Sequence, residues 1–224
     1  MARSSERPTA PPRRLPLNRA RVVEAAVALA DEAGLPKVTM RAVAGRVGVE
    51  AMSLYNHVEN RDALVDGMVA EVFAEIPLPD PEAPWADALR ERAIAAHAAL
   101  LRHPWAIGLM DSRRRSGPAT YRHHDAVLAV LCEGGFSVAG AVHAVSLLDS
   151  YVYGYALQER SLSAGAEESL QALARSVLAE LPDGRYPFLA EAAALRAESA
   201  DDALETEFRF GLDLVLRTLA TIKG

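Results

Sequence analysis

The sequence predicts an all-α protein, with a small N-terminal helical unit followed by a larger one. Apolar residues recur at three- and four-residue spacing along almost the whole chain, as they do in amphipathic helices. No segment shows the strict alternation of a half-buried strand, and the sequence has no internal repeat. Hydrophobic residues make up 50% of the chain, which is enough to bury a sizeable core.

Four helices are predicted before residue 77. The first ends near Gly34, a residue suited to a helix C-terminus, and Thr39 is the predicted N-cap of the second. A third, short helix runs from Ala51 to Val58, and the fourth begins at Arg61. The predicted inward residues of the four helices are Val22, Ala26, Leu29 and Ala33; Val43, Ala44 and Val47; Leu54 and Val58; and Leu64, Met68, Val72 and Ile76.

A proline-rich segment marks the predicted boundary between the two units. Its prolines are Pro77, Pro79, Pro81 and Pro84. They end the fourth helix and stiffen the connection to the next one. We therefore expect a first unit over residues 17–76 and a second over residues 77–224, preceded by a disordered basic arm over residues 1–16.

The larger unit is also predicted to consist of helices. One helix ends at His103-Pro104, another ends at Gly134-Gly135, and Ser137 caps a long third helix. Two more helices follow a polar stretch. The apolar stripes are Leu89, Ala93, Ala96 and Leu100; Val138, Val142, Val145, Leu148, Val152 and Tyr155; and, in the last helix, Leu204, Phe208, Leu212, Val215 and Leu219.

Composition argues against several classes of protein. The longest apolar runs, such as residues 25–30, are too short to cross a bilayer, and the N-terminal residues lack the apolar region of a signal peptide. Cys132 is the only cysteine, so no internal disulfide can form. We expect a cytoplasmic protein with no membrane partner.

Charge is distributed unevenly along the chain. The net charge is -6, yet residues 1–61 contain ten basic and six acidic residues, whereas residues 62–224 contain fourteen basic and twenty-four acidic ones. A basic head on an acidic body suits a protein that meets DNA at one end.

The segment from Thr39 to Arg61 has the layout of a helix-turn-helix. Gly48 can adopt the positive φ of the tight turn, and Ala44 is small where the two helices would cross. An inward set of Val43, Val47, Val49 and Leu54 leaves an outward set of Ala51, Met52, Ser53, Tyr55 and Asn56. A helix presented in this way can lie in the major groove of DNA.

This segment resembles the DNA-binding region of the tetracycline-repressor (TetR) family. The resemblance rests on Gly48-Val49, Leu54-Tyr55-Asn56-His57-Val58, Arg61 and Ala63-Leu64. It implies that Thr39, Tyr55 and Arg61 contact DNA phosphates. It also implies that the residues facing base edges are Arg41, Ala51, Met52, Ser53 and Asn56.

Side-chain chemistry gives these base contacts a first interpretation. Arg41 suits guanine, Asn56 suits adenine, and Met52 or Ala51 suits a thymine methyl group. His57 is expected to pack inside the domain. The basic arm before Leu17 has two open roles, one as a contact with phosphates or the minor groove and one as a solvated tail.

The larger unit resembles the regulatory domain of the same family at residues 99–106, 134–137 and 147–159. The resemblance implies a small-molecule inducer and a homodimer built on a four-helix bundle, here from residues 137–160 and 201–221 of each subunit. Such a two-fold dimer would read an inverted-repeat operator. Tetracycline is not the expected inducer, because Met110 replaces one histidine of the family's drug–magnesium site and the segment 77–84 lacks the other.

Candidate pocket residues combine apolar bulk with polar groups, as small-molecule cavities do. They are His97, Trp105, Met110, Tyr121, His124, His143, Leu147, Tyr151, Tyr155 and Phe188. For each one, a place in the core or the dimer interface is the alternative interpretation. The adjacent His123 and His124 do not share a helix face, so no metal site is predicted.

The sequence therefore predicts a ligand-responsive, DNA-binding transcriptional regulator without a cofactor. A repressor released from its operator by an inducer is the simplest form, and activation is the other. A helical protein-interaction adaptor and an all-α enzyme are the alternatives from other classes. No catalytic residue is predicted, because Cys132 has no nucleophile motif around it and the chain has no phosphate-binding glycine loop.

Overall fold

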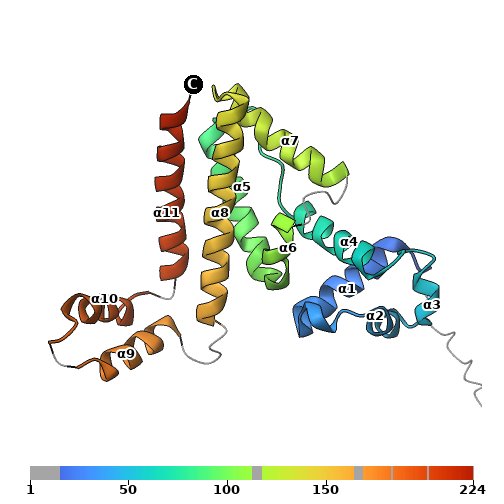
Figure 1. The fold of residues 1–224 in the computed structure, drawn as a ribbon, viewed down its shortest axis with the longest axis horizontal. Helices are drawn as coiled ribbons and strands as arrows, with labels where there is room; N and C mark the ends of the chain where they lie inside the picture. Colours follow the sequence, from blue (N-terminus) through green and yellow to red (C-terminus); the bar gives the residue numbers. More distant parts are fainter. Residues whose placement is uncertain (1–15, 113–117, 164–168, 183, 201, 224) are drawn as a thin grey trace, which may run out of the picture.

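The computed structural model describes residues 16–112, 118–163, 169–182, 184–200 and 202–223. All regular structure in these ranges is helical, so the predicted fold class is confirmed (Figure 1). The predicted basic arm, apart from Pro16, and the run of three arginines at 113–115 lie outside the described residues.

The first helices form a head at one side of the molecule (Figure 1). They are α1 (Arg19–Ala33), η1 (Leu35–Lys37), α2 (Met40–Val47), α3 (Ala51–Leu54) and α4 (Arg61–Ala74). The body contains α5 (Trp85–Arg102), η2 (Pro104–Ala106), α6 (Ile107–Ser112), α7 (Pro118–Glu133), α8 (Val138–Ser163), α9 (Leu170–Glu180), α10 (Pro187–Ala197), α11 (Ala203–Leu219) and η3 (Ala220–Ile222). Helices α5, α8 and α11 pack side by side, and α9 pairs with α10 as a hairpin at their lower end (Figure 1).

The predicted helix ends rest on local hydrogen bonds. The Thr39 hydroxyl oxygen accepts the N–H of Ala42 at 3.1 Å, and the Ser137 hydroxyl oxygen accepts the N–H of Gly140 at 3.1 Å. Gly34 and Gly48 have φ values of 82° and 73°, in the region that glycine tolerates best. These helix boundaries follow from short-range chemistry and are confirmed.

Three details of the predicted helices are wrong. Two helices, α9 and α10, lie between the long helix and the last one, where a single helix was predicted, and α6 was not predicted. The third helix ends at Leu54 and continues as a turn, in which the Leu54 carbonyl accepts the N–H of His57 at 2.8 Å and that of Val58 at 2.9 Å. The inward face of α1 is rotated, with Val23 and Ala30 buried and Ala33 exposed. The reason is that α1 packs against both α2 and α4, and a single stripe cannot serve two neighbours.

The buried apolar residues form two cores, one in the head and one in the body. Helix α4 contributes to both, with Leu64, Val65 and Met68 in the head core and Val69, Val72, Phe73 and Ile76 in the body core. Trp105 and Leu109 pack against both cores. A displacement of α4 therefore disturbs both units at once.

Within the described residues, no single helix combines the length and apolarity needed to cross a membrane. One bent pair, Thr120–Glu133 with Val138–Leu162, passes the same test of length and composition when its two helices are taken together.

Candidate DNA-binding surface and effector pocket

The turn between α2 and α3 has the geometry of a Schellman helix end. The N–H of Val49 donates to the Ala44 carbonyl at 3.0 Å, and the N–H of Gly48 donates to the Gly45 carbonyl at 3.3 Å. This double closure needs the positive φ of Gly48 and fixes the direction in which α3 leaves. Val43, Ala44 and Leu54 are buried beneath the turn.

The outward residues of α3 are presented to solvent. Met52 is 76% exposed and Tyr55 is 46% exposed, and Asn56 is exposed beside them. Ala51 and Ser53 are half-buried, whereas Thr39 and Arg41 are exposed at the start of α2. These residues thus present polar and aromatic side chains to solvent on α2 and α3.

Arg61 has an internal role that the sequence did not reveal. Its Nε donates to the Val38 carbonyl at 2.9 Å and its Nη2 donates to the Leu35 carbonyl at 3.2 Å. These bonds hold the start of α4 against the segment before α2. A phosphate contact by Arg61 would have to use its remaining N–H groups.

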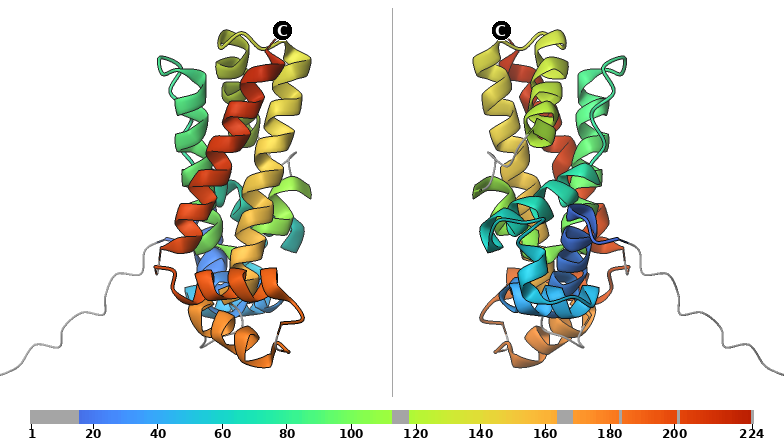
Figure 2. Two further views of the ribbon diagram at one scale, coloured as in Figure 1. Left: turned by 90° about the vertical axis from the view of Figure 1, so that its left-hand side faces the viewer. Right: turned by 90° about the vertical axis from the view of Figure 1, so that its right-hand side faces the viewer.

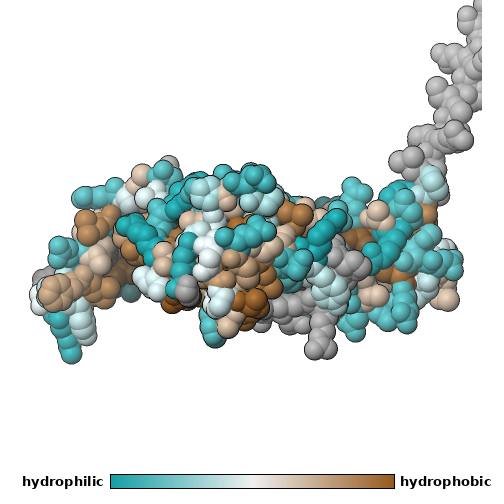
Figure 3. Space-filling view, turned by 90° about the horizontal axis from the view of Figure 1, so that it is seen from above, coloured by the Kyte–Doolittle hydropathy of each residue, from teal (hydrophilic) through white to brown (hydrophobic). Residues whose placement is uncertain are grey.

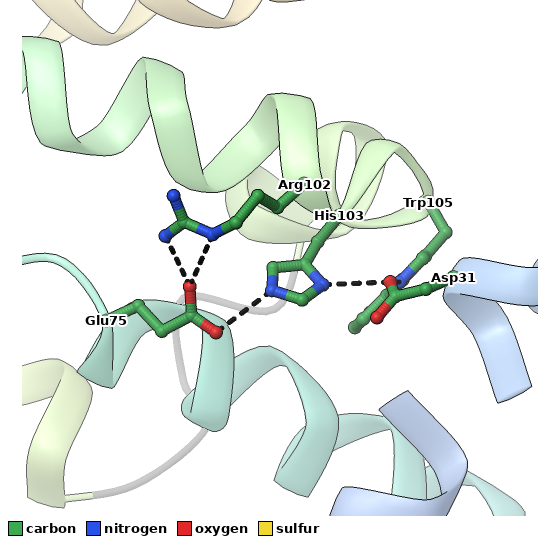
Figure 4. Close-up of polar contacts among 5 residues, drawn as sticks. All are labelled: Asp31, Glu75, Arg102, His103 and Trp105. Carbon is green, nitrogen blue, oxygen red and sulfur yellow. Dashed lines mark hydrogen bonds and ion pairs between the residues drawn. The ribbon is translucent and has the colours of Figure 1, made fainter. Parts of the chain in front are cut away.

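A group of polar residues joins the head to the body, and we call it the junction cluster: Asp31, Glu75, Arg102, His103 and Trp105 (Figure 4). His103 Nδ1 lies 2.8 Å from Asp31 Oδ1, and its Nε2 lies 2.9 Å from Glu75 Oε1. Asp31 comes from α1 and Glu75 from the end of α4, so His103 holds two head helices to the body.

Two further donors complete the junction cluster. The Trp105 indole N–H donates to Asp31 Oδ1 at 2.6 Å, and Arg102 Nε donates to Glu75 Oε2 at 3.2 Å. Burial by itself would raise the pKa of Glu75, but the hydrogen bonds from Arg102 and His103 outweigh it and lower that pKa. The carboxylate of Glu75 is therefore stabilised in its charged form.

A second polar group lies inside the body. Arg92 Nε donates to His123 Nε2 at 3.0 Å, and the Arg92 guanidinium lies 3.3 Å from Asp149 Oδ1. Burial, the Arg92 charge and His124 lower the pKa of His123 to about 4. Because His123 Nε2 accepts from Arg92, it cannot bind a metal ion, and the described residues contain no cluster with the ligands of a metal site.

An aromatic cluster lines the inner side of α8. His97 stacks on Phe208 with ring centroids 4.0 Å apart, and Tyr151 and Tyr155 pack against the same Phe208 ring. The Tyr155 hydroxyl donates to the Leu204 carbonyl at 2.7 Å. His97 Nε2 lies 2.9 Å from Glu159 Oε2. These contacts fix α5, α8 and α11 together at the level where α9 and α10 begin.

A pocket of about 310 Å³ lies beside this cluster, between the end of α8, the α9–α10 hairpin and the start of α11. Its apolar lining is Leu162, Leu170, Leu173, Ala174, Val177, Leu189, Ala192, Ala193 and Leu204, and its polar lining is Tyr155, Gln158, Glu159, Arg196 and Glu207. An apolar cavity of this size with a few polar groups is typical of a small-molecule site.

Comparison with known proteins identifies the family. Residues 22–68 match the family model for bacterial regulatory proteins of the tetR family, and residues 78–222 match the tetracyclin repressor-like C-terminal domain. The chain belongs to the TetR family of transcriptional regulators. It is a ligand-responsive DNA-binding regulator and not an enzyme.

Individual relatives support this placement. The chain is 34% identical over 180 residues to an HTH-type transcriptional regulator of Saccharopolyspora erythraea, covering 78% of this chain and 74% of that protein. It is 32% identical to the repressor DrrR1 of Streptomyces coeruleorubidus, covering 90% and 77%. The Streptomyces coelicolor TetR family protein ActR, solved in complex with actinorhodin, matches with a TM-score of 0.77 at 27% identity, covering 94% and 100%.

The structure of this TetR family member separates the ten candidate pocket residues. Only Tyr155 lines the pocket described above, and His97 and Tyr151 adjoin it through Phe208. Met110 is buried in the body core, and Trp105 belongs to the junction cluster. The others lie elsewhere: Tyr121, His143 and Leu147 are exposed, His124 packs on Phe73, and Phe188 is 84% exposed at the start of α10. In the single chain, therefore, one of the ten candidates lines this pocket, and several of the others have the core positions that were the alternative interpretation.

Sequence reasoning also missed the polar partners that matter most. One signal was available for Arg92, since it falls within the apolar stripe of Leu89, Ala93 and Ala96, and a charge there needs a buried partner. No comparable signal marks Asp31 or Glu75, which look like ordinary surface carboxylates in the sequence.

Proposed function

We propose that this protein is a homodimeric repressor that binds an inverted-repeat operator and leaves it when a small-molecule effector binds to the body. The single observation that carries the DNA-binding assignment is the exposed surface of Arg41, Met52, Tyr55 and Asn56 around a closed helix-turn-helix. In this proposal residues 17–76 bind DNA, and residues 77–224 bind effector and form the dimer. The protein works in the cytoplasm and has no membrane partner.

The proposed roles follow from the position of each residue on the head. Arg41, Ala51, Met52, Ser53 and Asn56 face base edges. Thr39, Tyr55 and Arg61 contact phosphates, with the Thr39 hydroxyl hydrogen still free to donate because only its oxygen serves the cap. The relative DrrR1 carries the name of a repressor, which supports repression as the direction of control.

Exposed apolar residues support the proposed dimer. On α8 and α11 these are Val138, Val142, Leu147, Leu157, Phe210 and Leu214. The two helices lie side by side at the front of the molecule, and above the α9–α10 hairpin no other helix lies in front of them (Figure 2, left). A large uncovered apolar surface of this kind marks an interaction site. A two-fold pairing of α8 and α11 with a second copy would bury it and place two heads on one DNA duplex.

The test is selection of bound sequences from a random DNA pool by the purified protein, followed by affinity measurements on variants. Tyr55→Phe removes one phosphate hydrogen bond per protomer, so the dimer should bind its operator roughly thirtyfold more weakly, a loss of about 2 kcal/mol. Tyr186→Phe is the matched control, because Tyr186 is equally exposed at 46% but lies at the N-cap position of α10, in the body.

A base contact has a different signature from a phosphate contact. Arg41→Ala should weaken operator binding and also relax the preference at one base position of each half-site. Arg175→Ala, at an exposed position on α9, should change neither. A wild-type protein that enriches no sequence at any salt concentration, or a Tyr55→Phe variant that binds as tightly as wild type, would overturn the proposed DNA surface.

A further inference from the structure

The pocket beside α8 has no counterpart among the ten residues predicted from the sequence, apart from Tyr155. It is lined by residues from the end of α8, from the α9–α10 hairpin and from the start of α11. The volume of about 310 Å³ suits a compact organic molecule. Side chains such as Leu170, Leu173, Val177 and Leu189 give it apolar walls.

The charges of the pocket do not cancel. Arg196 and Glu207 form an ion pair, with Arg196 Nη2 3.0 Å from Glu207 Oε1 and 3.2 Å from its Oε2. Glu159 is different, because its partner in the structure is His97 at 2.9 Å. The charges of Arg196 and Glu207 neutralise each other. The remaining charge of the lining is the negative charge of Glu159, whose partner among the described residues is the imidazole of His97.

That imidazole is held in its neutral form. His97 is 6% exposed and lies flat on the Phe208 ring. Burial lowers the pKa of His97, although Glu159 and Glu205 act in the opposite direction, so His97 carries little charge at pH 7. The pKa of Tyr155 is raised to about 12, first by burial and then by the negative charge of Glu207, with a smaller contribution from Glu159.

The remaining polar groups of the pocket also favour a positively charged ligand. The Tyr155 hydroxyl donates its hydrogen to the Leu204 carbonyl, so Tyr155, which lines the pocket, can offer a ligand only an acceptor. An aromatic ring beside a carboxylate attracts organic cations through its face. An anion would be repelled by Glu159 while Arg196 is already paired with Glu207, and a neutral apolar molecule would further desolvate the Glu159 carboxylate.

We propose that this pocket is the effector site and that it takes a compact organic cation, with an apolar body against α9 and α10 and its positive group against Glu159. The assignment rests on the proposed function, since it names the class of effector that the body binds. The site differs from a larger and more open groove of about 540 Å³ along α6 and α8, whose lining includes small residues such as Gly108, Ser146 and Gly154.

Two probe ions of the same shape and opposite charge test the proposal. Isothermal titration calorimetry with the full chain should show tetraphenylphosphonium binding at least about tenfold more tightly than tetraphenylborate, because only the cation pairs with Glu159. Glu159→Gln should lower the phosphonium affinity about tenfold, while its amide can still bond to His97. Glu191→Gln removes one charge from an exposed position of α10 outside the pocket lining and should leave the affinity unchanged.

A steric variant provides an independent arm. Ala192 lines the pocket yet is exposed, so Ala192→Trp should fill the space without disturbing the core and abolish phosphonium binding. Ala179→Trp, at an exposed position of α9 outside the lining, is its control. Light scattering should show that Ala192→Trp remains a dimer. Loss of the dimer would mean that a second copy occupies the pocket, and the proposal would be wrong.

The outcomes separate this proposal from the DNA-binding one. Equal affinity for the two ions, or an unchanged affinity in Glu159→Gln, would overturn the cation site whatever the DNA selection shows. If an operator is found, saturating phosphonium should weaken operator binding by wild type and not by Ala192→Trp. Operator affinity that stays the same with phosphonium bound would refute the effector role. Failure to enrich any DNA would refute the proposed function, while the calorimetry would still decide the pocket.

Discussion

His103 is buried between two carboxylates from different head helices, so its removal should weaken the contact between head and body. A hydrogen bond to a charged group contributes about 1.5–3 kcal/mol when it is buried. The side chains of Asp31 and Glu75 are 30% and 34% exposed, so water replaces part of each lost bond. We take roughly half of the buried value for each of the two bonds, and His103→Ala should then lower the free energy of unfolding by about 1.5–3 kcal/mol.

The chain provides its own reporter for this measurement. It has two tryptophans, and Trp105 belongs to the junction cluster. In a Trp85→Phe background, urea unfolding followed by fluorescence therefore reads Trp105 alone. His103→Ala should lower the urea midpoint. Glu32→Gln, adjacent to Asp31 on α1, breaks only an exposed ion pair with Arg46 and should leave the midpoint unchanged.

A double-mutant cycle between Asp31→Asn and His103→Ala isolates the contact itself. Residues in direct contact show interaction energies of about 0.5–3 kcal/mol, and we expect about 1 kcal/mol for this pair. If the two losses simply add, the hydrogen bond between Asp31 and His103 contributes nothing and the reasoning about the junction cluster is refuted.

Three other predictions follow from single positions. Gly48→Ala should lower the free energy of unfolding by about 1–2 kcal/mol, because the φ of Gly48 is 73°. Gly45 is the control: it lies three residues earlier in helical geometry, and no atom lies near a new Cβ, so Gly45→Ala should stabilise the protein by up to about 1 kcal/mol. Thermal unfolding of the two variants checks the sign of each change. His123 takes up its proton near pH 6.5 in the unfolded chain but at about pH 4 in the fold, so stability should fall by up to about 3 kcal/mol as pH drops through that window. In His123→Gln this loss should be absent, and an unchanged pH profile would contradict the assignment. Phe210→Asp places a charge on the exposed face of α11 and should yield monomers in light scattering; a persistent dimer would exclude this face as the interface.

The sequence was informative wherever a structure is set by neighbours in the chain. The Thr39 and Ser137 caps and the positive φ of Gly48 join residues within a few positions of one another, and all three were predicted. Most of the helices were predicted for the same reason, because a 3.6-residue period is a local property. The short α6 was missed, and one helix was predicted where the structure has α9 and α10.

The pocket and the junction cluster could not be predicted in that way. His103 and Asp31 are 72 positions apart, and His97 and Glu159 are 62 apart, so their pairing exists only after the helices have packed. Residue type alone cannot distinguish a histidine in a pocket from one that stacks on a ring or bridges two carboxylates. For this reason His97, Trp105 and His124 were all predicted as pocket candidates, although they lie in different places in the fold.

The connection between the pocket and the head is short. Glu159 faces the pocket, and the next residue, Arg160, donates from Nη1 to the Pro104 carbonyl at 3.2 Å, directly between His103 and Trp105 of the junction cluster. His97, the partner of Glu159, lies on α5, and the same helix ends at Arg102. Couplings between two sites amount to about 1–3 kcal/mol, which is the contribution expected of His103 alone. An effector that draws Glu159 away from His97 therefore needs to weaken only the junction cluster to change operator affinity by one or two orders of magnitude. Because the coupling between two binding sites is reciprocal, bound DNA must weaken effector binding by the same factor.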